Sequence, residues 1–454
     1  MNNLLKKAPK PTKAEISPCK PGKSCYTNLD VNDYSLYREA KTMSILINEA
    51  KKRIEQVRKK DVEVVVLQNG KPVENAYVSL RMKNHQFLFG AVSYAHGKLG
   101  HPGREERFTQ LFTRLLNYTM VPYHWSWYEP QRGQYNEPYT GNLVRWAQEN
   151  GLKRKLHALI WHELCPDWVT DENVEEEYIR RINHLMEKHG NDFDFFDLAN
   201  ETTVNDRFDN PVSRWVKRKG PIEMMKFGTK LVRQWKPDAK LLFGDWNVHG
   251  EDYFRFLRTM RENDVDIVIL GMQSHMHRDL WTQEETLRVI DRAAEFGWPI
   301  HFPECSICSG KPIGEMNYGA GAINRFSETE EDLYWQAEFA RDFYTLVFSH
   351  PAVEALSWFD FTDHRWLNAP AGLVDDDLNP KPVYGMLYDM IHRQWHTDAD
   401  LGTGANGVCR TRVFCGNYDI TVRANGVCKT LNQDILRESF YEGGGDPYRI
   451  CVEL

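Results

Sequence analysis

Three short apolar runs in the middle of the chain decide the fold: AKLLFGDWN (239–247), IVILGMQSH (267–275) and PIHFPE (299–304). Each has the length of a β-strand, and amphipathic segments of helical length separate them. Strands that alternate with helices are typical of parallel sheets, because a chain that crosses over between parallel strands usually does so through a helix. The centre of the chain therefore predicts a βαβ architecture.

The same alternation continues on both sides of this centre. The remaining strand-like runs are FLFGAV (87–92), YTMVPY (118–123), KLHALIW (155–161), FDFFDLAN (193–200) and VEALSWFDF (353–361). Eight strands, each followed by a helix over roughly 310 residues, predict a (β/α)8 TIM barrel at residues 87–398. A doubly wound open sheet is the alternative. Its nucleotide-binding versions carry a glycine-rich turn after the first strand, which FGAVSYAHGKLG (89–100) does not match.

The two ends of the chain have a different character. Residues 1–35 are rich in Pro, Lys and Ser and predict a flexible arm, while residues 36–86 predict a helix followed by a β-hairpin around Asn69-Gly70. Residues 399–454 alternate like strands, with turns expected at Gly416-Asn417 and Asn425-Gly426. Neither end can bury a sheet face alone, so we expect both to pack together as a small β-sandwich-like accessory module.

Composition excludes several classes of protein. In 454 residues, 41% are hydrophobic and 12% aromatic, which is too much for a disordered chain. A net charge of −7 with mixed signs argues against nucleic acid or an anionic membrane as the main partner. No apolar run approaches the ~20 residues that span a bilayer.

The start of the chain lacks the apolar segment of a signal peptide. We therefore expect a cytoplasmic protein if Met1 is the native start, or an extracellular one if a leader has been removed. The oligomeric state stays open.

The spacing of the nine cysteines does not favour a metal site. Cys305-x-x-Cys308 has the spacing of a zinc half-site but lacks a second Cys/His pair, so buried or free thiols are expected. Disulfides remain open, if the compartment is oxidising, among the six cysteines near the ends: Cys19, Cys25, Cys409, Cys415, Cys428 and Cys451. We expect no metal and no cofactor.

Two acidic residues stand where a barrel carries its chemistry. The active site of such a barrel lies at the carboxyl ends of the strands, where Glu201 follows the fourth run and Glu304 ends the seventh. Cleaving a glycosidic bond needs one protonated acid and one carboxylate on opposite faces of the sugar. Alone, Glu201 could be a salt-bridged strand terminus, but its pairing with Glu304 favours catalysis.

Other residues at the strand ends suit a carbohydrate substrate. Tryptophan faces can stack on sugar rings, while amide and imidazole groups can bind hydroxyls. The candidate substrate-binding residues are His124, His157, Trp161, Asn200, Gln273, His275, Trp358 and Trp366.

Several motifs occur in the order that one known family carries them. HALIWH (157–162), DLANE (197–201), GMQSH (271–275), Pro303-Glu304 and PKP (380–382) resemble H-T-L-V-W-H, D-V-V-N-E, G-x-Q-S-H, T-E and P-K-P. From about residue 87 to 395 the chain is similar to glycoside hydrolase family 10, the family of endo-β-1,4-xylanases. The resemblance implies a retaining double displacement, with Glu201 as acid/base and Glu304 as nucleophile. It also implies sugar contacts from Asn200, Gln273, His275 and the two tryptophans Trp358 and Trp366.

The chain departs from this family at one subsite. Met120, Val121 and His124 stand where the family has a sugar-binding Glu, Asn and Lys, and Leu164 replaces a Gln. We therefore expect a divergent member that cleaves β-1,4-xylosidic bonds in xylan or xylo-oligosaccharides. The alternatives are the same chemistry, in an exo-acting mode, on a small, decorated or hydrophobic β-glycoside, and a non-catalytic carbohydrate-binding protein.

Two charged runs are expected on the surface. Lys217-Arg218-Lys219 could instead meet an acidic sugar branch, and Asp375-Asp376-Asp377 could be imagined as a calcium site, although no other ligands are spaced around it.

Overall fold

The computed structural model describes residues 45–277, 280–318, 321–438 and 446–454. Its centre is a closed barrel of eight parallel strand positions, two of which consist of two short strands each. The pairing of β10 with β12 and of β15 with β4 closes the barrel. This confirms the predicted (β/α)8 barrel. The barrel strands are β4 (Leu88–Val92), β5 (Tyr118–Pro122), β6 with β7 (Lys153–His157, Ile160–Trp161), β8 (Phe195–Asn200), β9 (Leu241–Asp245), β10 with β11 (Ile269–Met272, Ser274–Met276), β12 (Ile300–Ile307) and β15 (Val353–Asp360).

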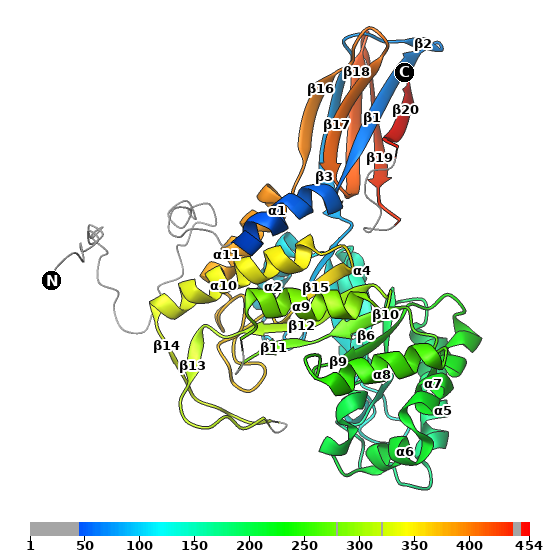
Figure 1. Ribbon diagram of the computed structural model, residues 1–454, viewed down its shortest axis with the longest axis vertical. Coiled ribbons are helices and arrows are strands. Elements are labelled where there is room, and N and C mark those ends of the chain that lie inside the picture. The colour runs from blue at the N-terminus through cyan, green and yellow to red at the C-terminus, as the bar shows by residue number, and fades with distance from the viewer. Residues whose placement is uncertain (1–44, 278–279, 319–320, 439–445) are drawn as a thin grey trace, which may run out of the picture.

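Helices follow each strand position of the barrel and cover its outside (Figure 1). The principal ones are α2 (Pro102–Leu115), α4 (Glu137–Glu149), α5 (Val174–His189), α6 (Pro211–Lys219), α7 (Pro221–Trp235), α8 (Glu251–Glu262), α9 (Gln283–Ala294), α10 (Glu330–Ser349) and α11 (Pro382–Asp389). A π-helical turn at Met390–Gln394 extends α11. Short elements in the loops are α3 (Trp125–Tyr128), the 3-10 turn Thr202–Arg207, and the hairpin β13–β14 (Gly310–Pro312, Phe326–Glu328).

Side chains fill the inside of the barrel in layers. At the amino ends of the strands, Tyr118, Phe195 and Leu242 belong to one buried apolar cluster. At the carboxyl ends, Met120 and Phe359 belong to another. The interior is therefore a packed core, and chemistry is confined to the mouth at the carboxyl ends.

The two ends of the chain together build an accessory module of two four-stranded sheets, which projects from one end of the barrel (Figure 1). One sheet contains β1 (Lys59–Gln68), β2 (Lys71–Pro72), β17 (Val408–Phe414) and β20 (Tyr448–Glu453). The other contains β3 (Tyr77–His85), β16 (Asp398–Gly402), β18 (Gly416–Ala424) and β19 (Val427–Ile435). Val64, Leu80 and Ile420 from both sheets lie in one buried cluster, as a β-sandwich requires.

Two details of this module differ from the sequence prediction. The hairpin at Asn69-Gly70 forms, but only two residue pairs flank it, and the second alternating run (β3) joins the opposite sheet. Gly416 and Asn417 are strand residues of β18 and not a turn. A Cβ on Gly416 would lie 2.1 Å from the carbonyl oxygen of Asn84, so glycine serves a close approach of two strands there.

A short segment fastens the module to the barrel. Helix α1 (Ile45–Val57) buries Ile47 and Ala50 against Leu346 of α10. Next to it, the buried guanidinium of Arg58 donates hydrogen bonds to the carbonyls of Phe348, His350 and Val353, at 2.6, 2.8 and 2.7 Å. Val353 begins β15, so the module is attached at the amino-end face of the barrel, opposite the mouth. The arm predicted at residues 1–35 lies outside the described residues.

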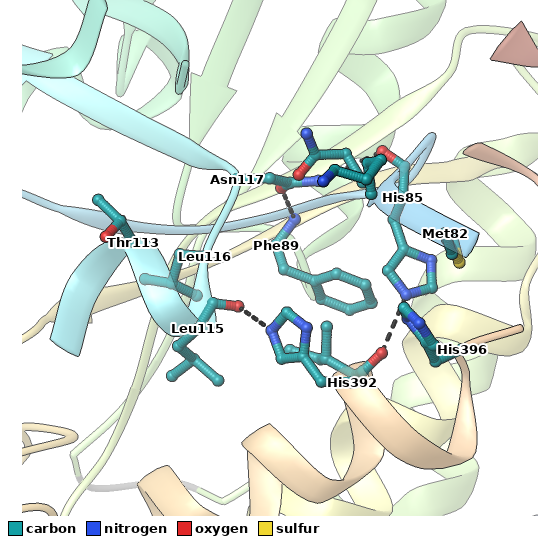
Figure 2. Close-up of a pocket in the computed structure, with 12 residues that line it drawn as sticks. Met82, His85, Phe89, Thr113, Leu115, Leu116, Asn117, His392 and His396 are labelled. Carbon is teal, nitrogen blue, oxygen red and sulfur yellow. Dashed lines mark hydrogen bonds between the residues drawn. The ribbon is translucent and has the colours of Figure 1, made fainter. Parts of the chain in front are cut away.

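A small cavity of about 80 Å³ marks the same junction (Figure 2). His85, at the end of β3, bonds through Nε2 to the carbonyl of Ile391 at 3.0 Å, and His392 bonds in the same way to Leu115. The Asn117 amide oxygen accepts the Phe89 N–H at 2.9 Å. These polar bonds join three segments that are far apart in the sequence.

All seven cysteines of the described segments are free thiols, including Cys305 and Cys308, which are both buried. Cys19 and Cys25 lie outside the described residues. Among the helices that the structure describes, none combines the length and the apolar character that a bilayer crossing demands.

Candidate active site

Local irregularities of the strands aim the two predicted carboxyl groups. In β12, Pro303 and Glu304 together oppose a single residue of β15, because the register shifts between Phe302 and Cys305. A second shift in β8, between Asp197 and Ala199, precedes Glu201. Extra residues of this kind bend a strand and redirect its side chains. Glu201 directly follows β8 and adopts the left-handed region, at φ 56°.

Amide groups surround Glu201. Its Oε1 accepts a hydrogen bond from the Asn200 side chain at 3.1 Å and a longer one from Gln273 at 3.4 Å. Gln273 also donates to Asn200 Oδ1 at 3.2 Å. The other oxygen, Oε2, is buried and has no hydrogen-bond partner among the described residues.

Histidines surround Glu304 instead. His275 Nε2 donates to Glu304 Oε2 at 2.9 Å and is held from behind by Ser306 Oγ at 2.7 Å. His157 Nε2 lies 4.0 Å from Glu304 Oε1, an oxygen that has no hydrogen-bond partner in the described part of the chain. Below the site, Asp197 Oδ2 contacts His157 Nδ1 at 2.6 Å and Lys155 Nζ at 2.7 Å.

The two acids face one gap. Gln273 contacts Glu201 and His275 contacts Glu304, and these two partners are separated by one residue where β10 continues into β11. The charge of Glu304 also raises the pKa of Glu201. The two carboxyl groups therefore face the same part of the mouth.

Their different surroundings shift the pKa values of the two acids in opposite directions. Burial raises the pKa of Glu201 to about 8, helped by the negative charges of Glu304 and Asp245. Burial also acts to raise the pKa of Glu304, but the His275 hydrogen bond and the charges of His157 and Lys155 outweigh it and lower that pKa. At neutral pH Glu201 is protonated and Glu304 is ionised, which is how one site can hold an acid and a base.

Aromatic side chains line the mouth. The His124 ring lies 5.1 Å from Trp161 and 5.4 Å from His157. The Trp366 ring lies 4.5 Å from His275. The structure thus brings together at the mouth seven of the eight predicted substrate-binding residues.

The eighth, Trp358, does not reach the mouth. It is fully buried, donates to the Ala371 carbonyl at 2.6 Å, and faces Tyr344 of α10. Phe359 occupies the expected place, with its ring 4.8 Å from His275 and 5.2 Å from Trp366. A register shift between β15 and β4 at Phe359 explains the difference, because one extra residue exchanges the two faces of a strand.

Two carboxyl groups near the mouth were not predicted from the sequence. Asp360 is buried and accepts the backbone N–H of Trp366 at 3.1 Å, and burial raises its pKa to about 7. Glu163 is half-buried, and its pKa is raised by burial and by Glu304. Each lies two residues after a predicted site residue, Glu163 after Trp161 and Asp360 after Trp358. No motif around either residue indicates a functional role.

Two of the departures from the expected pattern, Met120 and Val121, are apolar and buried. Met120 and Val121 are both fully buried, and Met120 packs with Val92 and Phe359 under the mouth.

The basic run is engaged in ion pairs, since Lys217, Arg218 and Lys219 contact Asp206, Asp171 and Glu175. No group of three or more metal-ligating side chains occurs in the segments that the structure describes.

Hydrolysis of a glycosidic bond uses an acid and a carboxylate on either side of a sugar, and aromatic rings at the site offer faces on which that sugar can stack. The barrel and its mouth provide both. Fold and site together define a glycoside hydrolase.

Comparison with known proteins identifies the family: residues 82–390 match the model of glycosyl hydrolase family 10, and the chain belongs to that family. Endo-1,4-beta-xylanase B of Thermotoga neapolitana is 25% identical over 291 residues, which are 60% of this chain and 78% of the relative. The structure of native xylanase 10B from Thermotoga maritima is similar in fold, with a TM-score of 0.57 at 21% identity, over 68% of this chain and 96% of that one.

Another relative matches a larger part of the chain. Anti-sigma-I factor RsgI6 of Acetivibrio thermocellus is 23% identical over 391 residues, which is 83% of this chain. The chain spans 46% of the length of that relative. The matched part exceeds residues 82–390, so the similarity extends beyond the barrel.

Proposed function

We propose that this glycoside hydrolase cleaves β-1,4-xylosidic bonds in xylan or xylo-oligosaccharides with retention of anomeric configuration. The family membership and the xylanase relatives support the substrate class. The opposed pKa shifts of Glu201 and Glu304 across one gap are the observation that carries the mechanism.

In the first step, protonated Glu201 gives its proton to the glycosidic oxygen while Glu304 attacks the anomeric carbon. The bond from that carbon to the leaving oxygen breaks, and a bond to Glu304 Oε1 forms. Oε1 suits this role because Oε2 is the oxygen that His275 binds. In the second step, ionised Glu201 removes a proton from water, the water oxygen attacks the anomeric carbon, and Glu304 is released.

The test is a pair of measurements on an aryl β-xyloside with a good leaving group. Glu201→Ala is expected to lose at least about 100-fold in kcat/KM on xylo-oligosaccharides. Azide should restore turnover of the aryl substrate and yield the β-xylosyl azide, because a small anion can attack the glycosyl-enzyme without base catalysis. Glu149→Ala, at an exposed carboxyl on α4, is the matched control and should behave like the wild type.

Proton NMR of the first product decides the stereochemistry. A β-configured xylose that later mutarotates supports retention. An α-configured first product, or full activity of Glu201→Ala, would exclude the proposed mechanism.

A smaller or more hydrophobic β-glycoside is the second candidate substrate. The buried apolar pair Met120 and Val121 favours it, because these side chains offer no hydrogen bond to a distal sugar. Product profiles on long xylan separate the two: internal cleavage supports the endo-acting enzyme, and release of single units from one end supports the alternative.

A further inference from the structure

A cavity of about 310 Å³ lies beside the mouth, between the loop that follows β4 and the segment that runs from α3 to α4. Its lining includes Lys98, Trp127, Asn136 and Tyr139. The cavity adjoins the site, because the Trp127 ring lies 4.8 Å from His124, which in turn contacts His157.

The loop fixes the position of Lys98. The carboxylate of Glu105 accepts the backbone N–H groups of Gly97 and Leu99, each at 2.8 Å, so the residues on both sides of Lys98 are tied to one side chain. The ammonium group lies 3.8 Å from the centre of the Tyr139 ring. Tyr139 is held in turn by its hydroxyl, which donates to the Tyr94 carbonyl at 2.9 Å.

The ammonium group of Lys98 has no carboxylate within 4 Å among the described residues, and it contacts the Tyr139 ring. Partial burial lowers the pKa of Lys98, and the positive charge of Arg365 lowers it further. Two cations near one another, without a carboxylate at the lysine, create a positive potential that attracts an anion.

The rest of the lining suits a sugar. Trp127 exposes 52% of its surface, which is enough for a ring to stack on it. Asn136 precedes α4, but its side chain makes no capping bond, so its amide is available to a hydroxyl group.

We propose that this cavity binds a uronic acid unit of the substrate, with the sugar carboxylate on Lys98 and the sugar ring against Trp127. This inference rests on the proposed function, because the unit is part of the glycoside that is cleaved, and it makes Lys98 a specificity-determining residue. A neutral sugar would use the same indole and amide groups but would leave the ammonium group without a counter-charge.

Binding is measured in the Glu201→Gln background, so that no substrate is consumed. Isothermal calorimetry compares xylotetraose with xylotetraose that carries one glucuronic acid branch. Lys98→Met is expected to lower the ratio of acidic to neutral affinity about 5- to 10-fold, because it removes one charge-assisted hydrogen bond and keeps the side-chain stem. Lys230→Met, at an exposed lysine of α7, is the matched control and should leave the ratio unchanged. Salt at 0.5 M should weaken the preference of the parent protein in the same direction.

An affinity ratio that Lys98→Met does not change overturns the inference. Equal losses for both ligands also overturn it, because Lys98 would then contact a neutral sugar or support the loop. Hydrolysis by the unmodified enzyme tests the proposed function separately. If neither ligand is hydrolysed but the acidic ligand still binds through Lys98, the proposed function fails and the inference about Lys98 stands.

Discussion

Replacing Glu201 by glutamine tests the electrostatics of the site without relying on activity. The carboxyl group is buried, and its pKa is raised from 4.5 to about 8. Glutamine has the same shape, stays neutral at every pH, and its Oε1 can still accept the bonds from Asn200 and Gln273. Any pH dependence of the difference in stability between variant and wild type therefore reports the ionisation of Glu201.

The direction and size follow from proton linkage. Below pH 4.5 the carboxyl is protonated in both the folded and the unfolded state, so the two proteins should differ little. Between pH 4.5 and about 8 only the unfolded state loses this proton, and the wild type loses up to about 1.4 kcal/mol of stability per pH unit relative to Glu201→Gln. Above pH 8 the difference should level off at an advantage for the variant of about 5 kcal/mol.

Urea unfolding, followed by tryptophan fluorescence at pH 4, 6, 8 and 9, measures this difference. Glu149→Gln, at an exposed carboxyl, is the control for a lost surface charge. A stability difference that stays constant over the whole pH range, or one that shrinks as pH rises, would refute the reasoning about Glu201.

Three further changes test other parts of the structure. His275→Ala removes the hydrogen bond that helps to lower the pKa of Glu304, so the acid limb of kcat/KM should move to higher pH; an unmoved limb contradicts this assignment. Arg58→Met leaves three carbonyls at the module junction without their donor and should cost about 3–5 kcal/mol in thermal unfolding, while kcat of the folded enzyme stays the same. Gly244→Ala would place a Cβ 2.8 Å from Asn200 Oδ1 and should lower kcat/KM about 10-fold in a protein that still folds; wild-type activity would show that Asn200 can move freely.

The sequence was enough to predict the barrel and the acidic pair. Eight apolar runs separated by helical segments leave few alternatives to a parallel barrel, and a parallel barrel gathers its strand ends at one mouth. Glu201 and Glu304 could therefore be placed together although more than one hundred residues separate them.

The parts that sequence could not predict depend on register. The bulge that places Glu304 and the shift that turns Phe359 inward and Trp358 outward arise from pairing with neighbouring strands. The alternation of apolar and polar residues along a strand does not show where one extra residue shifts the register. The turn predicted at Gly416 was wrong for a related reason, because glycine is common both in turns and where two strands approach closely. Only the position of the Asn84 carbonyl shows that Gly416 is in a close strand contact.

The same packing separates the chemistry of this enzyme from its specificity. Glu201 and Glu304 have polar partners supplied by the strands themselves, so the reaction centre is as rigid as the barrel. The floor beside it is apolar, because Met120 is fully buried against Val92 and Phe359 and has no group that could bind a hydroxyl. Recognition of the distal part of a substrate must then come from residues farther out, on the loops after β4 and β5. Lys98 lies there, on a loop fixed by Glu105, so variation in these loops can change the substrate without disturbing Glu201 and Glu304.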